Sequence, residues 1–184
     1  MAPTEKITCV LITTKAEYPK IIMDRLDLGF FDEILIRFDS PSVYERYLLA
    51  KKAQNNIIYV QDDDCLVNYQ VLFEKWDGRI TNTMTKPFQE QYEPLGCTLV
   101  GWGCYFTKDM LSVFDKYIQK YGEDAHLLRE ADRIFTYLNK PFNTIIQPHQ
   151  DINASASDRM SAPDKLEFHF KSMREALEKC KSLT

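Results

Sequence analysis

Hydrophobic positions in the first 67 residues follow two different periods. Continuous apolar or β-branched runs are typical of buried strands, and three such runs occur: ITCVLITT (7–14), a strand within FDEILIRFDS (31–40), and IIYVQ (57–61). Between them, 15–28 and 42–54 carry apolar residues at helical spacing. Ser42 with Glu45 three residues later forms a capping-box pattern, which predicts that the second helix begins at Ser42.

This order of strand, helix, strand, helix, strand predicts parallel strands joined by right-handed crossovers, as in half of a Rossmann-like fold. Ligands of such sheets bind at the carboxyl ends of the strands. Asp39 follows the second predicted strand, and the triplet 62–64 (DDD) follows the third. We therefore expect a binding site at this edge of the sheet.

The second half of the chain has mixed periodicity. It predicts helices at 68–76, 108–121, 123–138 and 166–183, and strands at 79–84, 97–107 and 141–148. Gly101 and Gly103 interrupt the predicted strand CTLVGWGCYFT, which indicates that the backbone approaches another group closely there. The polar segment 149–165 is rich in Ser and Asp and is predicted to be a mobile loop.

Composition narrows the class of protein. The 184 residues fit one domain, and the formal net charge of −4 argues against a general nucleic-acid binder. Five cysteines without CxxC spacing favour a reducing compartment over a disulfide framework or zinc site. The sequence shows neither a hydrophobic leader nor a run of transmembrane length, so we expect a cytoplasmic protein without a membrane span.

The acidic triplet has a chemical interpretation. Hard cations such as Mg²⁺ or Mn²⁺ prefer oxygen ligands, and Mg²⁺ commonly uses one or two carboxylates, with substrate phosphates and waters completing its shell. In an extended segment Asp62 and Asp64 share one face, while Asp63 points to the other. The pattern therefore favours a D-x-D cation site, and the alternative is a solvated junction between a strand and a turn.

Together with LVGWGCYFTKDML (99–111) and LLREADRIFTYL (127–138), this order resembles the GT-A fold of nucleotide-sugar glycosyltransferases. The resemblance implies an α/β fold in which a mixed, Rossmann-like sheet is flanked by helices. It also implies one domain, 1–184, with a nucleotide-binding half (1–67) and an acceptor and catalytic half (68–184) closed by a C-terminal loop and helix. Small soluble members occur in bacteria and large DNA viruses, which implies cytoplasm, or host cytoplasm for a virus.

The resemblance also implies an activity. The activity is that of a hexosyltransferase that depends on Mn²⁺ or Mg²⁺. It moves a sugar from a nucleotide-diphosphate donor, with UDP preferred, to a hydroxyl of a glycan or other acceptor. Inversion is favoured. No nucleic-acid partner is implied. The implied site residues are Asp64, Asp62 and His149 for the metal; Thr13, Thr14, Asp39, Asp62, Asp63 and Arg159 for the donor; Gly101, Trp102 and Gly103 for the sugar and acceptor; and Asp132, with Glu130, for catalysis.

The catalytic helix departs from the family pattern, because the usual adjacent Glu-Asp pair is here Glu130-Ala131-Asp132. Residues two apart on a helix do not share a face, so only one of the two carboxylates can point into the site, and Asp132 is favoured as the base. Ordinary solvated helix charges are the alternative. Asp151 is a rival of His149 as the additional ligand, and Trp102 is equally compatible with a core position.

Two other functions remain open from the sequence. A Mg²⁺-dependent nucleotidyltransferase has a similar sheet, but usually carries a glycine-rich, basic loop after its first strand, where this chain has TTKAEYPK. A non-catalytic module that binds a nucleotide or carbohydrate would use the acidic triplet only to hold a structural cation.

Overall fold

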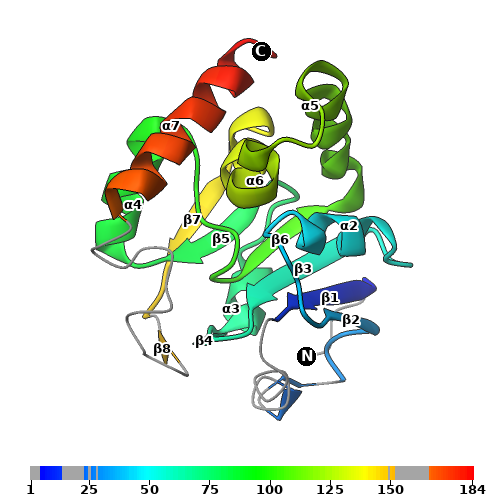
Figure 1. Ribbon diagram of the computed structural model, residues 1–184. Coiled ribbons are helices and arrows are strands. Elements are labelled where there is room, and N and C mark those ends of the chain that lie inside the picture. The colour runs from blue at the N-terminus through cyan, green and yellow to red at the C-terminus, as the bar shows by residue number, and fades with distance from the viewer. Residues whose placement is uncertain (1–4, 14–22, 25, 28, 149, 152–165) are drawn as a thin grey trace.

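The computed structural model describes residues 5–13, 23–24, 26–27, 29–148, 150–151 and 166–184. Their main feature is a six-stranded sheet in the order β2-β1-β3-β6-β5-β7 (Figure 1). The strands are β1 (Ile7–Ile12), β2 (Glu33–Arg37), β3 (Ile57–Asp62), β5 (Thr81–Met84), β6 (Cys104–Thr107) and β7 (Asn143–Ile146). The sheet is mixed, as the sequence predicts.

The first half has the predicted parallel arrangement. β1 lies between β2 and β3 and runs parallel to both, with Val10 opposite Leu35 on one side and Val60 on the other. Helix α2 (Glu45–Lys51) connects β2 to β3. The predicted start at Ser42 is wrong, because the N-cap of α2 is Tyr44. A backbone hydrogen bond closes the turn before the helix: the Ser42 carbonyl accepts from the Glu45 amide at 3.3 Å.

In the second half, β6 is antiparallel to β3 and β5, and β7 is parallel to β5. The strand predicted over 97–107 begins only at Cys104, so its first part is a correction. Gly103 adopts φ 100°, a left-handed conformation that favours glycine, and the Gly101 carbonyl turns to accept from the Asp62 amide at 2.6 Å. A separate two-stranded sheet pairs β4 (Cys65–Leu66) with β8 (Gln150–Asp151).

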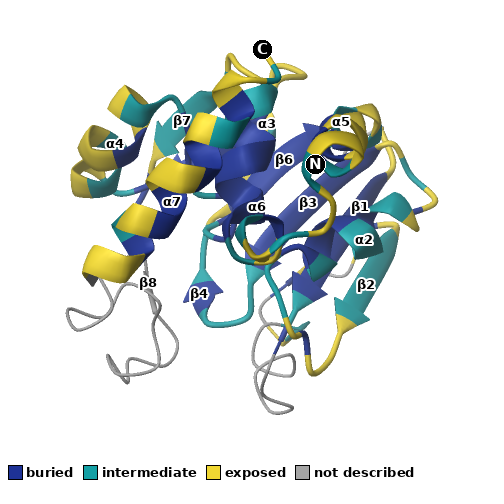
Figure 2. Cartoon of the chain, turned by 45° about the horizontal axis from the view of Figure 1, so that its top comes forward, coloured by how far each residue is buried: buried dark blue, intermediate teal, exposed yellow. Residues whose placement is uncertain are grey.

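Helices cover both faces of the large sheet. They are α3 (Tyr69–Glu74), α4 (Lys86–Tyr92), α5 (Val113–Tyr121), α6 (Ala125–Leu138) and α7 (Leu166–Lys181), with short 3₁₀ turns η1 (Glu93–Leu95) and η2 (Lys108–Ser112). Alternate strand residues serve the two faces: Val10 and Ile58 pack with α2, α5 and α6, whereas Cys9 and Tyr59 pack with α3 and an aromatic cluster. Figure 2 shows the sheet buried between these layers.

Helix α7 packs against α6 (Figure 1). It contributes to a separate hydrophobic cluster that includes Met84, Tyr92 and Met173. All five cysteines are buried free thiols. Among the described residues, no helix combines the length and apolar character that a membrane crossing requires.

Candidate functional site

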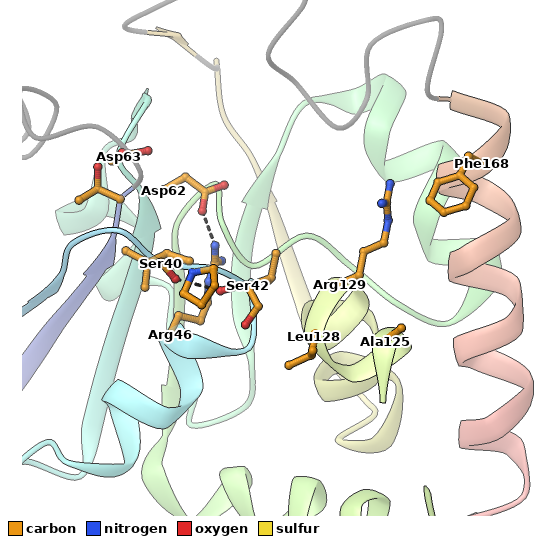
Figure 3. A pocket seen from close by; sticks show the side chains of 13 residues that line it. Ser40, Ser42, Arg46, Asp62, Asp63, Ala125, Leu128, Arg129 and Phe168 are labelled. Carbon is orange, nitrogen blue, oxygen red and sulfur yellow. Dashed lines mark hydrogen bonds and ion pairs between the residues drawn. The ribbon is translucent and has the colours of Figure 1, made fainter. Parts of the chain in front are cut away.

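A cavity of about 620 Å³ opens at the carboxyl ends of β1 and β3 (Figure 3). We call its two sides the strand wall and the helix wall. The strand wall consists of Ile12, Thr13, Ser40, Pro41, Ser42, Val43, Arg46, Asp62 and Asp63. The helix wall consists of Ala125, Leu128 and Arg129 from α6 and Phe168 from α7. The cavity thus lies at the sheet edge that the strand order predicts.

Asp62 is the last residue of β3, and its side chain is 34% exposed in the strand wall. Its carboxylate fits there only because residue 101 is glycine: a Cβ atom at Gly101 would lie 2.0 Å from Asp62 Oδ2. The close approach predicted from the glycine-broken segment is therefore an approach to Asp62. The Asp62 amide bond to the Gly101 carbonyl fixes the same position from the backbone.

Arg46 on α2 fixes the Asp62 carboxylate from the other side. Its side chain is only 4% exposed and donates to Asp62 Oδ1 and, at 3.3 Å, to Asp132 Oδ2. Burial disfavours the charged guanidinium, but Asp132 and Asp62 together hold the pKa of Arg46 above its usual range. The sequence interpretation missed Arg46, because ERYLLAK also carries Glu45 and Lys51 and nothing local marks Arg46 as the buried charge.

Asp132 is the second partner of Arg46. It is 4% exposed, and its Oδ1 accepts from the Tyr47 hydroxyl at 2.7 Å. Burial of the Tyr47 phenol, followed by the nearby Asp132 charge, raises the pKa of Tyr47 well above its usual range. The Tyr47 hydroxyl therefore keeps its proton and acts as a donor. These contacts link α6 to the end of β3 through Arg46.

Glu130 points away from this network, as the i, i+2 spacing predicts. Helix α6 departs from helical geometry at Glu130 (φ −112°, ψ 24°), and its carboxylate is fully buried. Its oxygens lie 3.4 Å from Arg129 Nε, 3.8 Å from Arg133 Nε and 3.9 Å from His169 Nδ1. Neither Glu130 nor Asp132 lines the cavity, and the catalytic role of either stays a prediction.

The acidic triplet is not extended throughout, which corrects one expectation. β3 ends at Asp62, and Asp63 and Asp64 form a turn, so strand alternation does not continue through them. Asp63 lines the cavity beside Asp62, whereas the prediction had it pointing away. Asp64 is half-buried and is not among the lining residues.

The triplet fits a cation that arrives with a ligand. Within the described ranges, no group of three or more His, Cys, Asp or Glu side chains is placed to hold a metal ion. Two carboxylates in one cavity wall nevertheless suit Mg²⁺, which takes its other ligands from phosphates and water. His149, the third predicted ligand, lies outside the described residues.

Of the other predicted site residues, some line the cavity and others do not. Thr13 lines the cavity, and its amide donates to the Arg37 carbonyl at 2.9 Å. Asp39 is exposed in a turn at φ 51°, and the lining residue there is its neighbour Ser40. Three further predicted residues are not lining residues: Gly101, Gly103 and Trp102, whose ring packs edge-on against Phe88 at 4.7 Å. Thr14 and Arg159 fall outside the described residues.

The chain does contain an adjacent Glu-Asp pair, Glu123-Asp124, which the sequence interpretation passed over. Asp124 is the N-cap of α6 and accepts from the Leu127 amide at 2.8 Å. It also pairs with Lys179 of α7 at 2.5 Å. These bonds give Asp124 a structural role at the helix start.

Comparison with known proteins bears on the fold. No family model and no curated protein matches the sequence. Among solved structures, glucosyl-3-phosphoglycerate synthase from Mycobacterium tuberculosis in complex with Mn²⁺, UDP and phosphoglyceric acid is similar, with a TM-score of 0.52 and 12% identity over 98% of this chain and 78% of that chain. Its complex with Mn²⁺, UDP-glucose and glycerol 3-phosphate gives 0.53 and 11%, over 98% and 80%. At this identity the likeness shows the fold, which is GT-A.

Proposed function

We propose that this chain, which has the GT-A fold, is a metal-dependent glycosyltransferase. It would move a sugar from a nucleotide-diphosphate donor, preferably a UDP-sugar, to an acceptor hydroxyl, with inversion at the anomeric carbon. One observation carries the proposal: Asp62 and Asp63 share a cavity wall at the carboxyl ends of β1 and β3. The structural neighbours, which were solved with Mn²⁺ and UDP or UDP-glucose, support the donor class.

The strand wall has the charge that such a donor complex needs. Two carboxylates, Asp62 and Asp132, share the single guanidinium of Arg46, so these three side chains together carry one excess negative charge. A divalent cation neutralises that excess. Asp62 and Asp63, with Asp64 and His149 from the sequence resemblance, would hold the cation, which when bound stabilises negative charge on the departing diphosphate.

The remaining donor contacts follow from the same wall. Thr13 and Ser40 lie at the ends of the first strand and of the connection to α2, where the nucleotide of a parallel sheet binds. Thr14, Asp39 and Arg159 are proposed donor contacts from the sequence resemblance alone. Gly101, Trp102 and Gly103 keep their proposed place near the sugar and acceptor. For Gly101, the contact with Asp62 supports an indirect role, because the glycine makes space for the carboxylate.

The base that accepts the proton of the acceptor hydroxyl remains Asp132 in this proposal, with Glu130 as the alternative. For direct proton transfer, the acceptor hydroxyl must take the place of the Tyr47 hydroxyl on Asp132 Oδ1. The bond from Arg46 to Asp132 also supports an indirect role, in which Asp132 positions Arg46 and Arg46 positions Asp62. If Asp132 is the base, Asp132→Asn should change the pH profile of transfer. If Asp132 only positions Arg46, the same substitution should weaken cation and donor binding.

The test is a panel of UDP- and GDP-sugars with Mn²⁺, Mg²⁺ or chelator, read by thermal shift and by donor hydrolysis. We expect cation-dependent stabilisation and turnover in the wild type, and loss of both in Asp62→Ala and Asp64→Ala with the fold retained. Asp109→Asn, an exposed change on η2, is the matched control. Absence of binding and hydrolysis across the panel would refute the proposal, and pyrophosphate release from a nucleoside triphosphate would indicate a nucleotidyltransferase instead.

A further inference from the structure

Arg129 is the only cationic side chain among the described residues of the helix wall. Its guanidinium extends from α6 beside Phe168 and lines the cavity (Figure 3). Its Nε lies 3.4 Å from Glu130, and its Cζ stands 4.5 Å from the centre of the Phe168 ring. Its charge also acts on His169, and its side chain is 29% exposed. A planar five-donor fork at the cavity can donate to an anionic ligand.

The surroundings of Arg129 carry an excess of positive charge. Glu130 is fully buried between Arg129, Arg133 and His169, and neither of its oxygens has a hydrogen-bond partner. Burial, reinforced by the two arginines, lowers the pKa of His169 to about 4, so the imidazole is neutral near pH 7. Arg129 and Arg133 share the carboxylate of Glu130; Asp132 also favours the charge of Arg133, whereas among the described residues Glu130 is the only carboxylate paired with Arg129. A mostly buried charge without a counter-ion is costly, and an anion bound in the cavity would compensate it.

We propose that Arg129 binds a phosphate monoester carried by the acceptor, with Phe168 as the platform for the guanidinium. This inference rests on the proposed function, because it names the acceptor class of the same site. An arginine fork matches two phosphate oxygens and forms charge-assisted hydrogen bonds to them. Leu128 and Phe168 are 39% and 60% exposed beside it and offer apolar contact to the acceptor skeleton.

The charge difference between the walls favours the acceptor over the donor as the partner of Arg129. The negative strand wall, at Asp62 and Asp63, suits a diphosphate that brings a divalent cation. The helix wall needs an anion without a cation. A cavity of about 620 Å³ is in the range that holds a small-molecule ligand, with donor and acceptor groups meeting between the walls.

The first test measures binding of inorganic phosphate by calorimetry, with the full chain saturated with UDP and Mg²⁺. We expect Arg129→Ala to weaken phosphate binding at least about tenfold, the loss expected for charge-assisted hydrogen bonds. Arg129→Lys should retain part of it, and Glu130→Gln, which removes the competing negative charge beside Arg129, should strengthen it. Arg174→Ala removes the same charge from the exposed face of α7 and should bind phosphate like the wild type.

Equal phosphate binding by the wild type and Arg129→Ala, or none by the wild type, would overturn the inference. The thermal midpoint of each variant shows that it is folded. UDP affinity separates the two proposals: a wild type that does not bind UDP refutes the proposed function, whereas an Arg129→Ala variant that loses UDP binding places Arg129 on the donor and overturns the acceptor assignment.

The second test compares acceptor pairs that differ by one phosphate. The soluble pair is glucose 6-phosphate and glucose; the lipid pair is lysophosphatidic acid and monoacylglycerol in phosphatidylcholine vesicles. We expect the phosphorylated member of one pair to have a lower KM, and Arg129→Ala to remove that preference; the active pair identifies the source of the phosphate. Preference for the neutral member, or a preference that survives Arg129→Ala, contradicts the inference. If neither pair is used, phosphate binding decides.

Discussion

Asp132 and Glu130 leave the same helix two residues apart and are both buried, yet their surroundings differ. Asp132 accepts hydrogen bonds from Tyr47 and Arg46, at 2.7 and 3.3 Å. Glu130 has three basic side chains at 3.4 to 3.9 Å and no hydrogen bond to either oxygen. Hydrogen bonds fix the direction of a carboxylate, whereas charges at these distances only balance it. Hydrogen bonds to Asp132 therefore fix the side chains behind the strand wall, whereas the balance of charges around Glu130 governs the side chains behind the helix wall.

The difference continues into the cavity. On the strand wall Arg46 forms ion pairs with both Asp132 and Asp62 and so fixes Asp62 relative to Asp132. Here two carboxylates surround one guanidinium. On the helix wall Arg129 shares the carboxylate of Glu130, which lies behind the wall, with Arg133. We infer that the first wall is prepared for a cation and the second for an anion.

The largest expected effect comes from removing the cation of the strand wall. In Arg46→Met, Asp132 stays buried without its ion-pair partner, so we expect the free energy of unfolding to fall by about 3–5 kcal/mol. Urea denaturation measures this loss, and Arg174→Met on the surface of α7 is the control. If Arg46→Met proves as stable as that control, the ion network does not hold the wall together.

Gly101→Ala tests the space beside Asp62. The new Cβ would overlap the carboxylate at 2.0 Å, so Asp62 must move, and we expect a cost of about 1–3 kcal/mol together with weaker Mn²⁺-dependent UDP binding. In a double-mutant cycle with Asp62→Ala, the binding losses should not add, because both changes act on one carboxylate. Fully additive losses would show that Gly101 acts elsewhere.

The helix wall should give stability a dependence on pH. Because the pKa of His169 is lowered to about 4 in the folded chain, the unfolded chain binds the proton more readily between about pH 4 and 6.5. Stability contributed by the neutral imidazole is therefore complete above about pH 6.5 and is lost as the pH falls toward 4, by about 2 kcal/mol at pH 5. His169→Gln should remove this part of the wild-type profile. Identical profiles for the two proteins would be evidence against it.

The smallest expected effect compares the two carboxylates directly. Asp132→Asn removes the acceptor of one of two hydrogen bonds, because the amide keeps a single oxygen, whereas Glu130→Gln replaces a carboxylate that makes none. We expect Asp132→Asn to be the more destabilising by about 1 kcal/mol. Parallel urea titrations measure the difference, and an equal or reversed order would remove the distinction between the walls.

The sequence predicts the fold of the first half because its signals are local. Three apolar runs predict β1, β2 and β3, and with them the place of Asp62 at a strand end, whereas the first predicted helix, 15–28, lies largely outside the described residues. The site's internal contacts depend on distant partners. Arg46 meets Asp132 from 86 residues away, and no periodicity reports such a pairing.

The turn after β3 was missed for the same reason. Cys65 and Leu66 leave the direction of β3 because they pair with Gln150 and Asp151, so Asp63 enters the cavity and strand alternation ends. Gly101 is an intermediate case, because the sequence predicts a close approach but not its partner. Local patterns thus predict where the site lies, and long-range contacts decide which side chains form it.

The most direct test of the proposed function is the affinity of the wild type for UDP, measured by calorimetry with Mn²⁺ and with chelator. Because Asp62 and Asp63 offer carboxylate oxygens in one cavity wall, we predict that Mn²⁺ strengthens UDP binding by at least about tenfold, which corresponds to about 1.4 kcal/mol. In Asp62→Asn this dependence on Mn²⁺ should disappear. UDP binding that is equally strong without the cation, or absent with it, would contradict a metal-dependent nucleotide-sugar site in this cavity.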